Sequence, residues 1–270
     1  MVNVSIVLYR PNKQQLLSLT EVLLRSALVQ SVYWVDNSPF PMEDLPQDAR
    51  VQYLFNAKNL GYGAAHNIAL RKTIEQGIKY HLVINADVTL DSTSLEQMLS
   101  YMEQENQVGC LMPKVLYPNG DLQYLCKLLP TPIDVITRRL LPKKWFIRRN
   151  TRYEMRDSGY ASIMNVPYLS GCFMLLRTEA LKQVGLFDER YFMYPEDMDL
   201  TRRIHKHYLT IYYPSVSITH EHGRASYKSL KMFGIHAINM CRYFDKWGWV
   251  FDAERERFNS AAIHNYLSCK

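Results

Sequence analysis

The stretch His81-Leu82-Val83-Ile84-Asn85-Ala86-Asp87 places a short apolar run directly before small and polar residues. Residues 81–84 are typical of a buried strand, and the Ala-rich stretch 63–76 that precedes them has the spacing of a helix. We therefore expect a helix followed by a strand, with Asp87 just beyond the carboxyl end of that strand.

The same alternation of strand and helix recurs along the chain. The further expected strands are 4–8, 32–35, 51–55, 168–177, 210–213 and 216–219, and the further expected helices are 16–28, 178–184, 196–207 and 227–247. Apolar strands separated by helices predict an α/β fold, with a mainly parallel sheet covered by helices on both faces.

Size and composition favour one large folded unit. The 270 residues include 47% hydrophobic and 21% charged side chains, which excludes a mostly disordered chain. No run approaches the roughly 20 apolar residues that span a bilayer, and residues 1–8 lack the basic start of a signal peptide. We therefore expect a cytoplasmic protein. The five cysteines include no Cys-x-x-Cys pair, which argues against a structural zinc site.

The formal net charge of +6 is concentrated in one part of the chain. Residues 127–156 contain nine basic and two acidic side chains. They lie in a proline-interrupted excursion, 113–167, which we expect to be irregular with short helices. Such a patch suits an anionic partner: phosphates, lipid head groups or nucleic acid. Because it matches no motif of the common nucleic-acid-binding modules, we expect no nucleic-acid partner.

Ligands of open α/β sheets bind beyond the carboxyl ends of the strands, so the residues there are the first to inspect. They are Tyr9, Arg10, Asp36, Asn37, 56–63 and 85–87. Almost all are polar or glycine, although Asp, Asn and Gly are also ordinary turn formers. Asp87 is either a ligand of a divalent cation that bridges a diphosphate, or the cap of a helix that begins near Ser92.

Residues 59–67, Asn-Leu-Gly-Tyr-Gly-Ala-Ala-His-Asn, place two glycines before the Ala-rich helix. Backbone N–H groups there could approach a phosphate or ribose at the helix N-terminus. The segment lacks both the dinucleotide fingerprint and the Gly-Lys-Ser/Thr of a P-loop, so a dehydrogenase or kinase is not favoured.

Residues 194–200, Tyr-Pro-Glu-Asp-Met-Asp-Leu, open a helix with three carboxylates. Acidic residues in a first turn are favoured by the helix dipole alone. Asp199 can also reach Arg203 one turn later, which leaves Asp197 as the free candidate for a general base.

His220-Glu221-His222-Gly223-Arg224 follows the last expected strand. Alternate residues of an extended segment face the same side, so His220 and His222 either face a metal or diphosphate together or are exposed loop histidines. Arg224 could neutralise phosphate charge.

Together these segments resemble the family 2 glycosyltransferases with the GT-A fold, and within them the bacterial rhamnosyltransferase-like branch of O-antigen and related surface-polysaccharide synthesis. The matching motifs are Val4-Ser5-Ile6-Val7, Val35-Asp36-Asn37-Ser38, 59–67, Asn85-Ala86-Asp87, Ser170-Gly171-Cys172-Phe173-Met174, Gly185-Leu186-Phe187-Asp188-Glu189, 194–200 and His220-Glu221-His222-Gly223. Each motif is weak alone, but their order and spacing are specific.

The resemblance implies a role for each matching position. The implied donor-binding residues are Leu8, Tyr9, Arg10, Asp36, Asn59, Gly61, Gly63, Asn67, Asn85, Ala86 and Arg224. Asp87 stands where the family binds Mn²⁺ or Mg²⁺, with the usual Asp-x-Asp reduced to Asn85-Ala86-Asp87, and His220 or His222 would complete that site. The implied acceptor-side residues are Ser170, Gly171 and Cys172. Glu196 and Asp197 match the catalytic acidic pair, with Asp197 as the base.

The implied reaction is an inverting transfer from dTDP-L-rhamnose or a UDP-sugar to a hydroxyl of a saccharide or polyprenyl-diphosphate-linked acceptor. The implied glycosyltransferase domain covers 1–225, followed by a C-terminal helical extension, 226–270. A non-catalytic protein that binds nucleotide sugars or polysaccharide is the alternative.

Aromatic and aliphatic residues alternate with Lys and Arg in the basic stretch, as in an interfacial membrane anchor. Leu140, Leu141, Trp145, Phe146 and Ile147 carry this pattern. We therefore expect peripheral contact with the cytoplasmic face of the inner membrane. The C-terminal helix has a similar mix, which fits core or homodimer contacts equally well.

Overall fold

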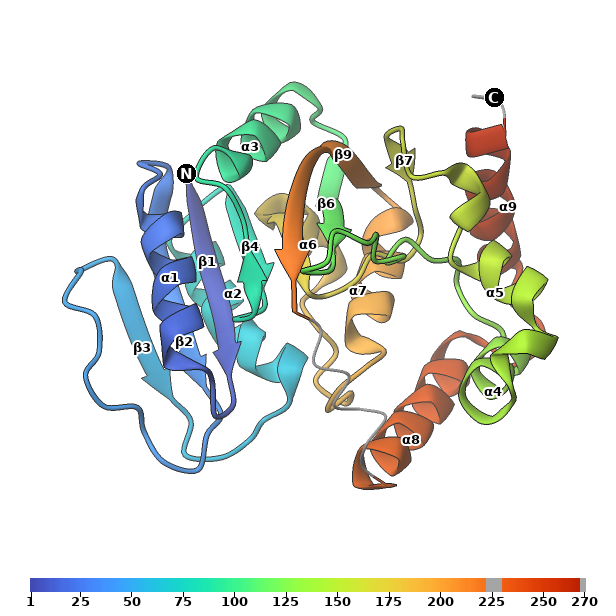
Figure 1. Ribbon diagram of the computed structural model, residues 1–270, viewed down its shortest axis with the longest axis horizontal. Helices are drawn as coiled ribbons and strands as arrows, with labels where there is room; N and C mark the ends of the chain where they lie inside the picture. The colour runs from blue at the N-terminus through green and yellow to red at the C-terminus, as the bar shows by residue number, and fades with distance from the viewer. Residues whose placement is uncertain (222–229, 268–270) are drawn as a thin grey trace.

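The apolar runs of the N-terminal half form parallel strands in the computed structural model, which describes residues 1–221 and 230–267. The strands are β1 (Val2–Leu8), β2 (Val29–Asp36), β3 (Val51–Phe55) and β4 (Tyr80–Ile84). β1 pairs in parallel with both β2 and β4, and β2 pairs in parallel with β3. The connecting helices α1 (Lys13–Leu24) and α2 (Tyr62–Glu75) pack beside this sheet (Figure 1).

The later strands extend the same sheet and run in both directions. They are β5 (Val88–Thr89), β6 (Val108–Leu116), β7 (Met164–Asn165), β8 (Phe173–Arg177) and β9 (Leu209–His220). Within the described residues the order is β3-β2-β1-β4-β8-β6-β9-β5, with β7 also pairing with β9. β8 is antiparallel to β4 and β6, whereas β6 and β9 are parallel. The expected mixed α/β fold, a mainly parallel sheet flanked by helices, is confirmed.

Several boundaries differ from the sequence-based expectation. The first helix, expected at 16–28, spans Lys13–Leu24 instead. β6 runs to Leu116, so the irregular excursion begins later than 113. The strand expected at 168–177 begins only at Phe173. β9 is one strand rather than two, because the residues around Pro214 are accommodated as a shift in the pairing with β6, where Pro113 pairs with Tyr213 and Lys114 with Ser217.

The excursion folds into short helices, as expected. They are α4 (Pro132–Leu140), the 3-10 turn η1 (Lys143–Trp145), α5 (Ile147–Tyr153) and the 3-10 turn η2 (Arg156–Ser158). α4 begins with a capping box: Thr131 Oγ1 accepts from the backbone N–H of Asp134, and the Asp134 carboxylate accepts from the backbone N–H of Thr131. Proline at the first position of the helix has a φ angle that already suits it.

The remaining helices are α3 (Ser94–Gln104), α6 (Thr178–Val184), α7 (Glu196–His205), α8 (Leu230–Trp247) and α9 (Ala253–Leu267). The expected start of α8 at Tyr227 and the expected domain boundary at 225/226 both lie outside the described residues. No helix in the described part of the chain is both long and apolar enough to cross a membrane.

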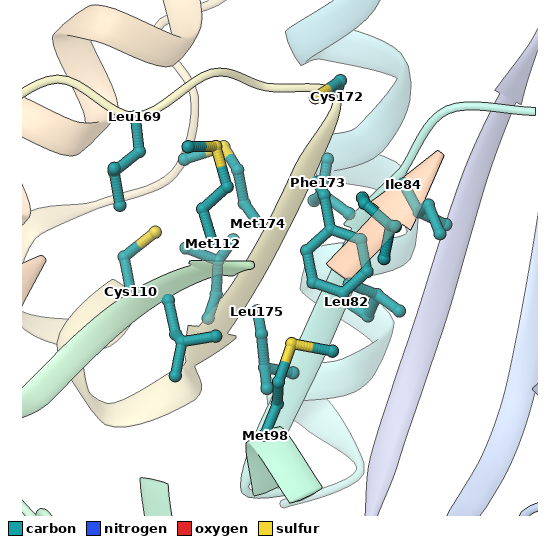
Figure 2. Packing of buried hydrophobic residues seen from close by; sticks show 14 of the residues in the cluster. Leu82, Ile84, Met98, Cys110, Met112, Leu169, Cys172, Phe173, Met174 and Leu175 are labelled. Atoms are coloured by element: carbon teal, nitrogen blue, oxygen red, sulfur yellow. The ribbon is translucent and has the colours of Figure 1, made fainter. Parts of the chain in front are cut away.

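Three buried clusters hold the described elements together, the smallest being Tyr33, Val35, Ala65 and Ala69 between the sheet and α2. The largest lies along the centre of the sheet, where β4, β6, β8 and α3 contribute residues such as Leu82, Met112, Phe173 and Met98 (Figure 2). The second joins α7, α8 and α9 to the excursion through Leu129, Tyr191, Met198, Met240, Tyr243, Phe244 and Phe258. The C-terminal helices therefore share a core with α7, the helix that carries the acidic pair.

Candidate active site

The carboxylate of Asp36 is fixed at the end of β2. Its Oδ1 accepts from the backbone N–H of Ser38 at 2.8 Å, and its Oδ2 accepts from the Tyr53 hydroxyl at 2.7 Å. Burial and this contact with Asp36 raise the pKa of Tyr53 to about 12. Tyr9 and Arg10 lie exposed beyond the end of β1.

Leu8 cannot present its side chain to a donor, which corrects the expectation for this residue. The side chain is wholly buried in the core, and the backbone oxygen accepts from the N–H of Asn37 at 2.9 Å. The apolar periodicity that made β1 recognisable also directs this side chain inward.

The two glycines at the start of α2 serve close packing. A Cβ on Gly61 would lie 2.3 Å from the backbone oxygen of Phe192, and one on Gly63 would lie 2.8 Å from Cβ of Phe187. Gly61 also has a φ of +90°, a conformation that side-chain-bearing residues rarely adopt. The N–H of Tyr62, the first residue of α2, donates to the Phe192 oxygen. The start of α2 therefore packs against the loop 187–192. The N–H of Tyr62 is bonded within the protein and is not presented to a phosphate.

The asparagines of the same motif are bonded within the protein. Asn59 Oδ1 accepts from the backbone N–H of Gly61 at 2.9 Å. Asn67 is 1% exposed; its amide donates to the Phe187 oxygen and to Glu189, and its Oδ1 accepts from the Phe187 N–H. Because both polar ends of Asn67 are engaged inside the fold, we assign it to holding this loop instead of contacting a donor.

Asp87 and His220 meet because β5 and β9 are adjacent, with Val88 opposite His220. Nε2 of His220 lies 3.3 Å from Oδ1 of Asp87 and 3.3 Å from Nδ2 of Asn85. Asp87 does not cap the following helix, because the N-cap of α3 is Thr93. Of the two roles that the sequence left open for Asp87, the cap is thus wrong, and the metal ligand stays a prediction.

Gln123 orients the His220 ring from the other side. Its Oε1 lies 3.1 Å from Nδ1 of His220, and its amide nitrogen donates to the His220 backbone oxygen at 2.7 Å. A proton on Nδ1 that is donated to Gln123 leaves a lone pair on Nε2 pointing toward Asp87. This is the usual arrangement behind a histidine that ligates a metal.

The donor set at this point fits a cation with few protein ligands. Asp87 and His220 supply one carboxylate and one imidazole, and no cluster of three or more His, Cys, Asp or Glu side chains suited to a metal occurs among the described residues. Mg²⁺ and Mn²⁺ accept phosphate and water oxygens for the rest of their coordination. His222 and Arg224, also expected near this point, lie outside the described residues.

The acidic pair opens α7 on the other side of the site. Asp197 Oδ2 accepts from the backbone N–H of Gly171 at 2.8 Å, and Oδ1 accepts from the N–H of Met198 at 2.7 Å. Burial raises the pKa of Asp197 to about 6, despite these bonds. Such a carboxylate is ionised at pH 7 yet binds a proton readily, as a general base requires.

Glu196 is more deeply buried than Asp197, at 4% exposure, and its Oε2 has no hydrogen-bond partner among the described residues. Burial, followed by the neighbouring charge of Asp197, raises its pKa well above the usual range. Burial thus favours the uncharged form of the Glu196 carboxyl group.

Tyr62 joins the two sides of the site. Its hydroxyl lies 2.6 Å from the backbone oxygen of Gly171 and 3.0 Å from Oδ1 of Asn85. Its pKa is raised well above the usual range, chiefly by burial, with the negative charges of Asp197 and Asp87 adding to the effect. The structure thus brings Asp87 and Asp197, which are 110 positions apart in the chain, to either side of one tyrosine.

The expected acceptor-side residues lie between the two carboxylates. A Cβ on Gly171 would lie only 3.1 Å from Cβ of Asp197, so this position has no room for a side chain. Ser170 Oγ accepts from the backbone N–H of Cys172. Burial raises the pKa of the Cys172 thiol to about 12, with Asp87 and Asp197 adding to the effect, so the thiol remains protonated and is not a nucleophile.

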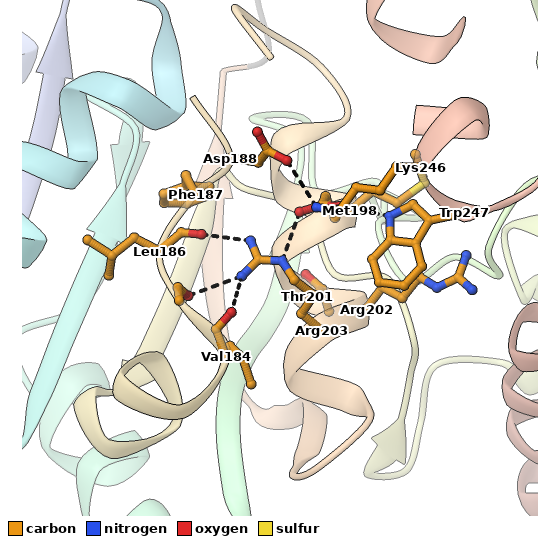
Figure 3. A network of polar contacts seen from close by, with 12 residues as sticks. Val184, Leu186, Phe187, Asp188, Met198, Thr201, Arg202, Arg203, Lys246 and Trp247 are labelled. Carbon is orange, nitrogen blue, oxygen red and sulfur yellow. Dashed lines mark hydrogen bonds and ion pairs between the residues drawn. The ribbon is translucent and has the colours of Figure 1, made fainter. Parts of the chain in front are cut away.

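A polar network holds α7 in place (Figure 3). The guanidinium of Arg203 binds Asp199, as expected from their spacing, and also the backbone oxygens of Val184, Gly185 and Leu186. Lys246 of α8 lies 2.7 Å from Asp199 and 3.0 Å from Asp188. The sequence offered no signal for the role of Lys246, because it depends on α8 returning to α7.

Comparison with known proteins identifies the family of the chain. The model of the glycosyltransferase like family 2 matches residues 34–254. The N-acetylglucosaminyl-diphospho-decaprenol L-rhamnosyltransferase of Mycobacterium tuberculosis is 28% identical over 232 residues, 82% of this chain and 76% of that protein. The rhamnosyltransferase WbbL of Escherichia coli is 26% identical over 195 residues, 68% of this chain and 69% of that protein.

Solved structures show the same fold at low sequence identity. GalNAc-T7, crystallised with UDP, GalNAc and Mn²⁺, superposes with a TM-score of 0.58 at 14% identity over 81% of this chain, which corresponds to 42% of its own. S. aureus TarS gives a TM-score of 0.58 at 13% identity over 99% of this chain and 43% of its own. Both likenesses concern the fold alone. With the family model matching most of its length, the chain belongs to glycosyltransferase family 2.

Proposed function

We propose that this enzyme transfers a sugar, L-rhamnose from dTDP-L-rhamnose or a hexose from a UDP-sugar, to a hydroxyl of a polyprenyl-diphosphate-linked saccharide during bacterial surface-polysaccharide synthesis. The observation that carries the proposal is that the Asp87–His220 pair and Asp197 both lie close enough to Tyr62 for their charges to act on it, with the Tyr62 hydroxyl between Asn85 and Gly171. The names of the relatives, which include a rhamnosyltransferase acting on N-acetylglucosaminyl-diphospho-decaprenol, support the choice of donor and acceptor.

The chemistry follows from these positions as an inverting single displacement. Asp197, held by the N–H groups of Gly171 and Met198, removes the proton of the acceptor hydroxyl as its oxygen attacks the anomeric carbon. The nucleoside diphosphate leaves on the opposite face of the sugar, toward Asp87 and His220. A Mg²⁺ or Mn²⁺ ion held by those two residues would offset the charge of the departing diphosphate.

A transfer assay tests the function directly. Purified enzyme with dTDP-L-rhamnose, a polyprenyl-diphosphate-linked N-acetylglucosamine and Mn²⁺ should form a disaccharide product whose new anomeric centre is inverted. A panel of UDP-sugars in the same assay identifies the donor. Thermal stabilisation by a donor, without transfer or hydrolysis of any donor in the panel, would instead favour the non-catalytic binding protein.

Tyr62→Phe should slow the reaction without weakening donor binding. The variant keeps the ring packed against His66, whose centroid is 4.4 Å away, but loses the hydroxyl that contacts Gly171 and Asn85. We expect kcat to fall on the order of tenfold, the effect of one lost hydrogen bond of about 1–2 kcal/mol, with an unchanged donor KM. The measurement is steady-state kinetics across pH, because a displaced Asp197 would also move the acidic limb of the profile.

The control is Tyr208→Phe, which removes a hydroxyl bonded to Gln183 away from the site. It should leave both kcat and the pH profile unchanged. Equal losses in the two variants would mean that Tyr62 does not position the base.

A further inference from the structure

Apolar side chains gather on the outer side of the basic excursion. Ile133 is 57% exposed, Trp145 68% and Ile147 62%, and all lie within one short stretch of the chain. Large apolar side chains exposed together usually mark an interaction surface. We propose that residues 131–153, together with the loop 249–251, form a docking face for an anionic lipid bilayer; the acceptor-related part of this inference rests on the proposed function.

The exposure results from how α4 is anchored. Asp134 binds the guanidinium of Arg149 at 2.6 Å, and Arg138 binds Glu154 at 2.7 Å, both on the side of α4 that faces the protein. The polar side of the helix is therefore turned inward and fixed by ion pairs, which leaves Ile133 and Ile136 outward. A helix that packed its apolar side into the core would instead bury Ile133 and Ile136 and expose its polar side.

A second segment extends the same face. In the loop between α8 and α9, Val250 is 69% exposed and Phe251 is 93% exposed. Arg255 joins this loop to the start of α4, because its guanidinium contacts the backbone oxygens of Val250 at 3.0 Å and Pro130 at 3.5 Å. Figure 1 shows α4, α5 and α8 at the same end of the molecule.

The charge of the docking face selects an anionic occupant. Lys144, Arg148 and Arg152 are exposed among the apolar residues, and none has an ion pair within the described chain. The two acidic side chains of the stretch, Asp134 and Glu154, are already neutralised by internal arginines. Apolar side chains interleaved with free cations suit anionic head groups over an acyl layer. A second copy related by two-fold symmetry would bring the same cations together.

The docking face adjoins the acceptor side of the active site. The N–H of Leu128 donates to the Tyr153 oxygen at 2.9 Å, joining α5 to the segment before α4. On that segment the Lys127 ammonium lies over the Tyr168 ring, and its charge acts on Asp197. With the face on the bilayer, a polyprenyl chain can stay in the lipid while the sugar on its diphosphate reaches Asp197.

Vesicle flotation of the full chain tests the proposal. Wild type should float with phosphatidylglycerol-containing vesicles at low salt and not with pure phosphatidylcholine vesicles. The double variant Trp145→Ser/Phe251→Ser should bind about tenfold more weakly or worse. Each of Lys144→Gln, Arg148→Gln and Arg152→Gln should weaken binding about fivefold. The matched control is Phe40→Ser, which removes an aromatic ring that is 79% exposed in the loop between β2 and β3 and should float as wild type.

Two results would overturn the proposal: wild type that does not float with anionic vesicles, or a Trp145→Ser/Phe251→Ser variant that floats as well as wild type. Light scattering without lipid tests a further contrary result: wild type that forms a dimer but does not bind vesicles, and a Trp145→Ser/Phe251→Ser variant that is a monomer. Transfer to a short-chain, water-soluble acceptor needs no bilayer, so it tests the proposed function separately from the docking face. If that activity is absent from wild type the proposed function fails, whereas flotation still reports on the docking face.

Discussion

Asp197→Asn should lower kcat by about 10²- to 10⁴-fold, the usual contribution of a positioned general base. Asparagine has nearly the same shape, and its single amide oxygen can still accept from the backbone N–H of Gly171, whereas the bond from the N–H of Met198 is lost. What the variant loses is the ability to take a proton from the acceptor hydroxyl. The measurement is the single-turnover rate at saturating donor, with donor affinity followed separately by thermal shift and expected to remain near that of wild type.

The pKa of Asp197 gives this prediction two further signatures. Because the base must be ionised, wild-type activity should fall as pH drops below about 6 and level off above it. The folded-state pKa is raised from 3.8 to about 6, so stability from this group is present below pH 3.8 and is lost as pH rises through 6. The melting temperature of the uncharged variant, taken relative to wild type, should therefore be higher at pH 7 to 8 than at pH 4.

Glu196→Gln is the informative comparison. Because burial favours the uncharged form of the Glu196 carboxyl group, glutamine resembles the form that the site favours, and we expect less than about a tenfold loss in kcat. Near wild-type turnover in Asp197→Asn, or a larger loss in Glu196→Gln than in Asp197→Asn, would mean that the base has been assigned to the wrong residue.

Asp87→Ala should lower kcat/KM by about 10²- to 10³-fold, corresponding to several kcal/mol of lost charge stabilisation on the leaving diphosphate. The variant leaves His220 facing the diphosphate without its carboxylate partner. The activity that remains should no longer respond to Mn²⁺. Turnover measured against Mn²⁺ concentration, with donor hydrolysis as a second readout, distinguishes this loss from general damage to the fold.

Gln123→Met separates the metal contact from the charge of Asp87. It keeps the length of the side chain but removes the oxygen next to Nδ1 of His220, so the imidazole loses its orientation. Changes of this kind typically weaken metal binding by about 10- to 100-fold. We therefore expect a higher Mn²⁺ concentration for half-maximal activity, with recovery at saturating metal.

If Asp87→Ala retained full activation by Mn²⁺, the metal would bind elsewhere.

The sequence predicted well what depends on local pattern. Apolar runs located β1 to β4, and Asp87 was expected beyond β4 because polar residues directly follow a buried strand. Three acidic residues in one first turn located the start of α7 at Glu196. In each case the signal lies within a few consecutive residues, where burial and helix polarity act directly on composition.

What the sequence did not predict depends on contacts between distant segments. β6 was missed as a strand, since Gly109 and Pro113 interrupt its apolar run; Gly109 is required because a Cβ there would lie 2.7 Å from Tyr208. Tyr62 and Gln123 became recognisable as site residues only when their partners, more than 90 positions away, were in place. The reversed polarity of α4 was likewise hidden, because an amphipathic pattern does not say which side faces the protein.

The buried guanidinium of Arg202 on α7 also bears on the order in which the chain can fold during synthesis. It is 1% exposed and lies 2.6 Å from Asp252 and 3.2 Å from Glu254, both beyond the end of α8. A buried cation deprived of its counterions destabilises a fold by about 3–5 kcal/mol. Strands β1 to β4 can associate early on the ribosome, but the helix that carries Asp197 gains its counterions only after residue 254 has emerged. Competence for transfer is thus delayed until residues 252–254 have been made and have reached α7.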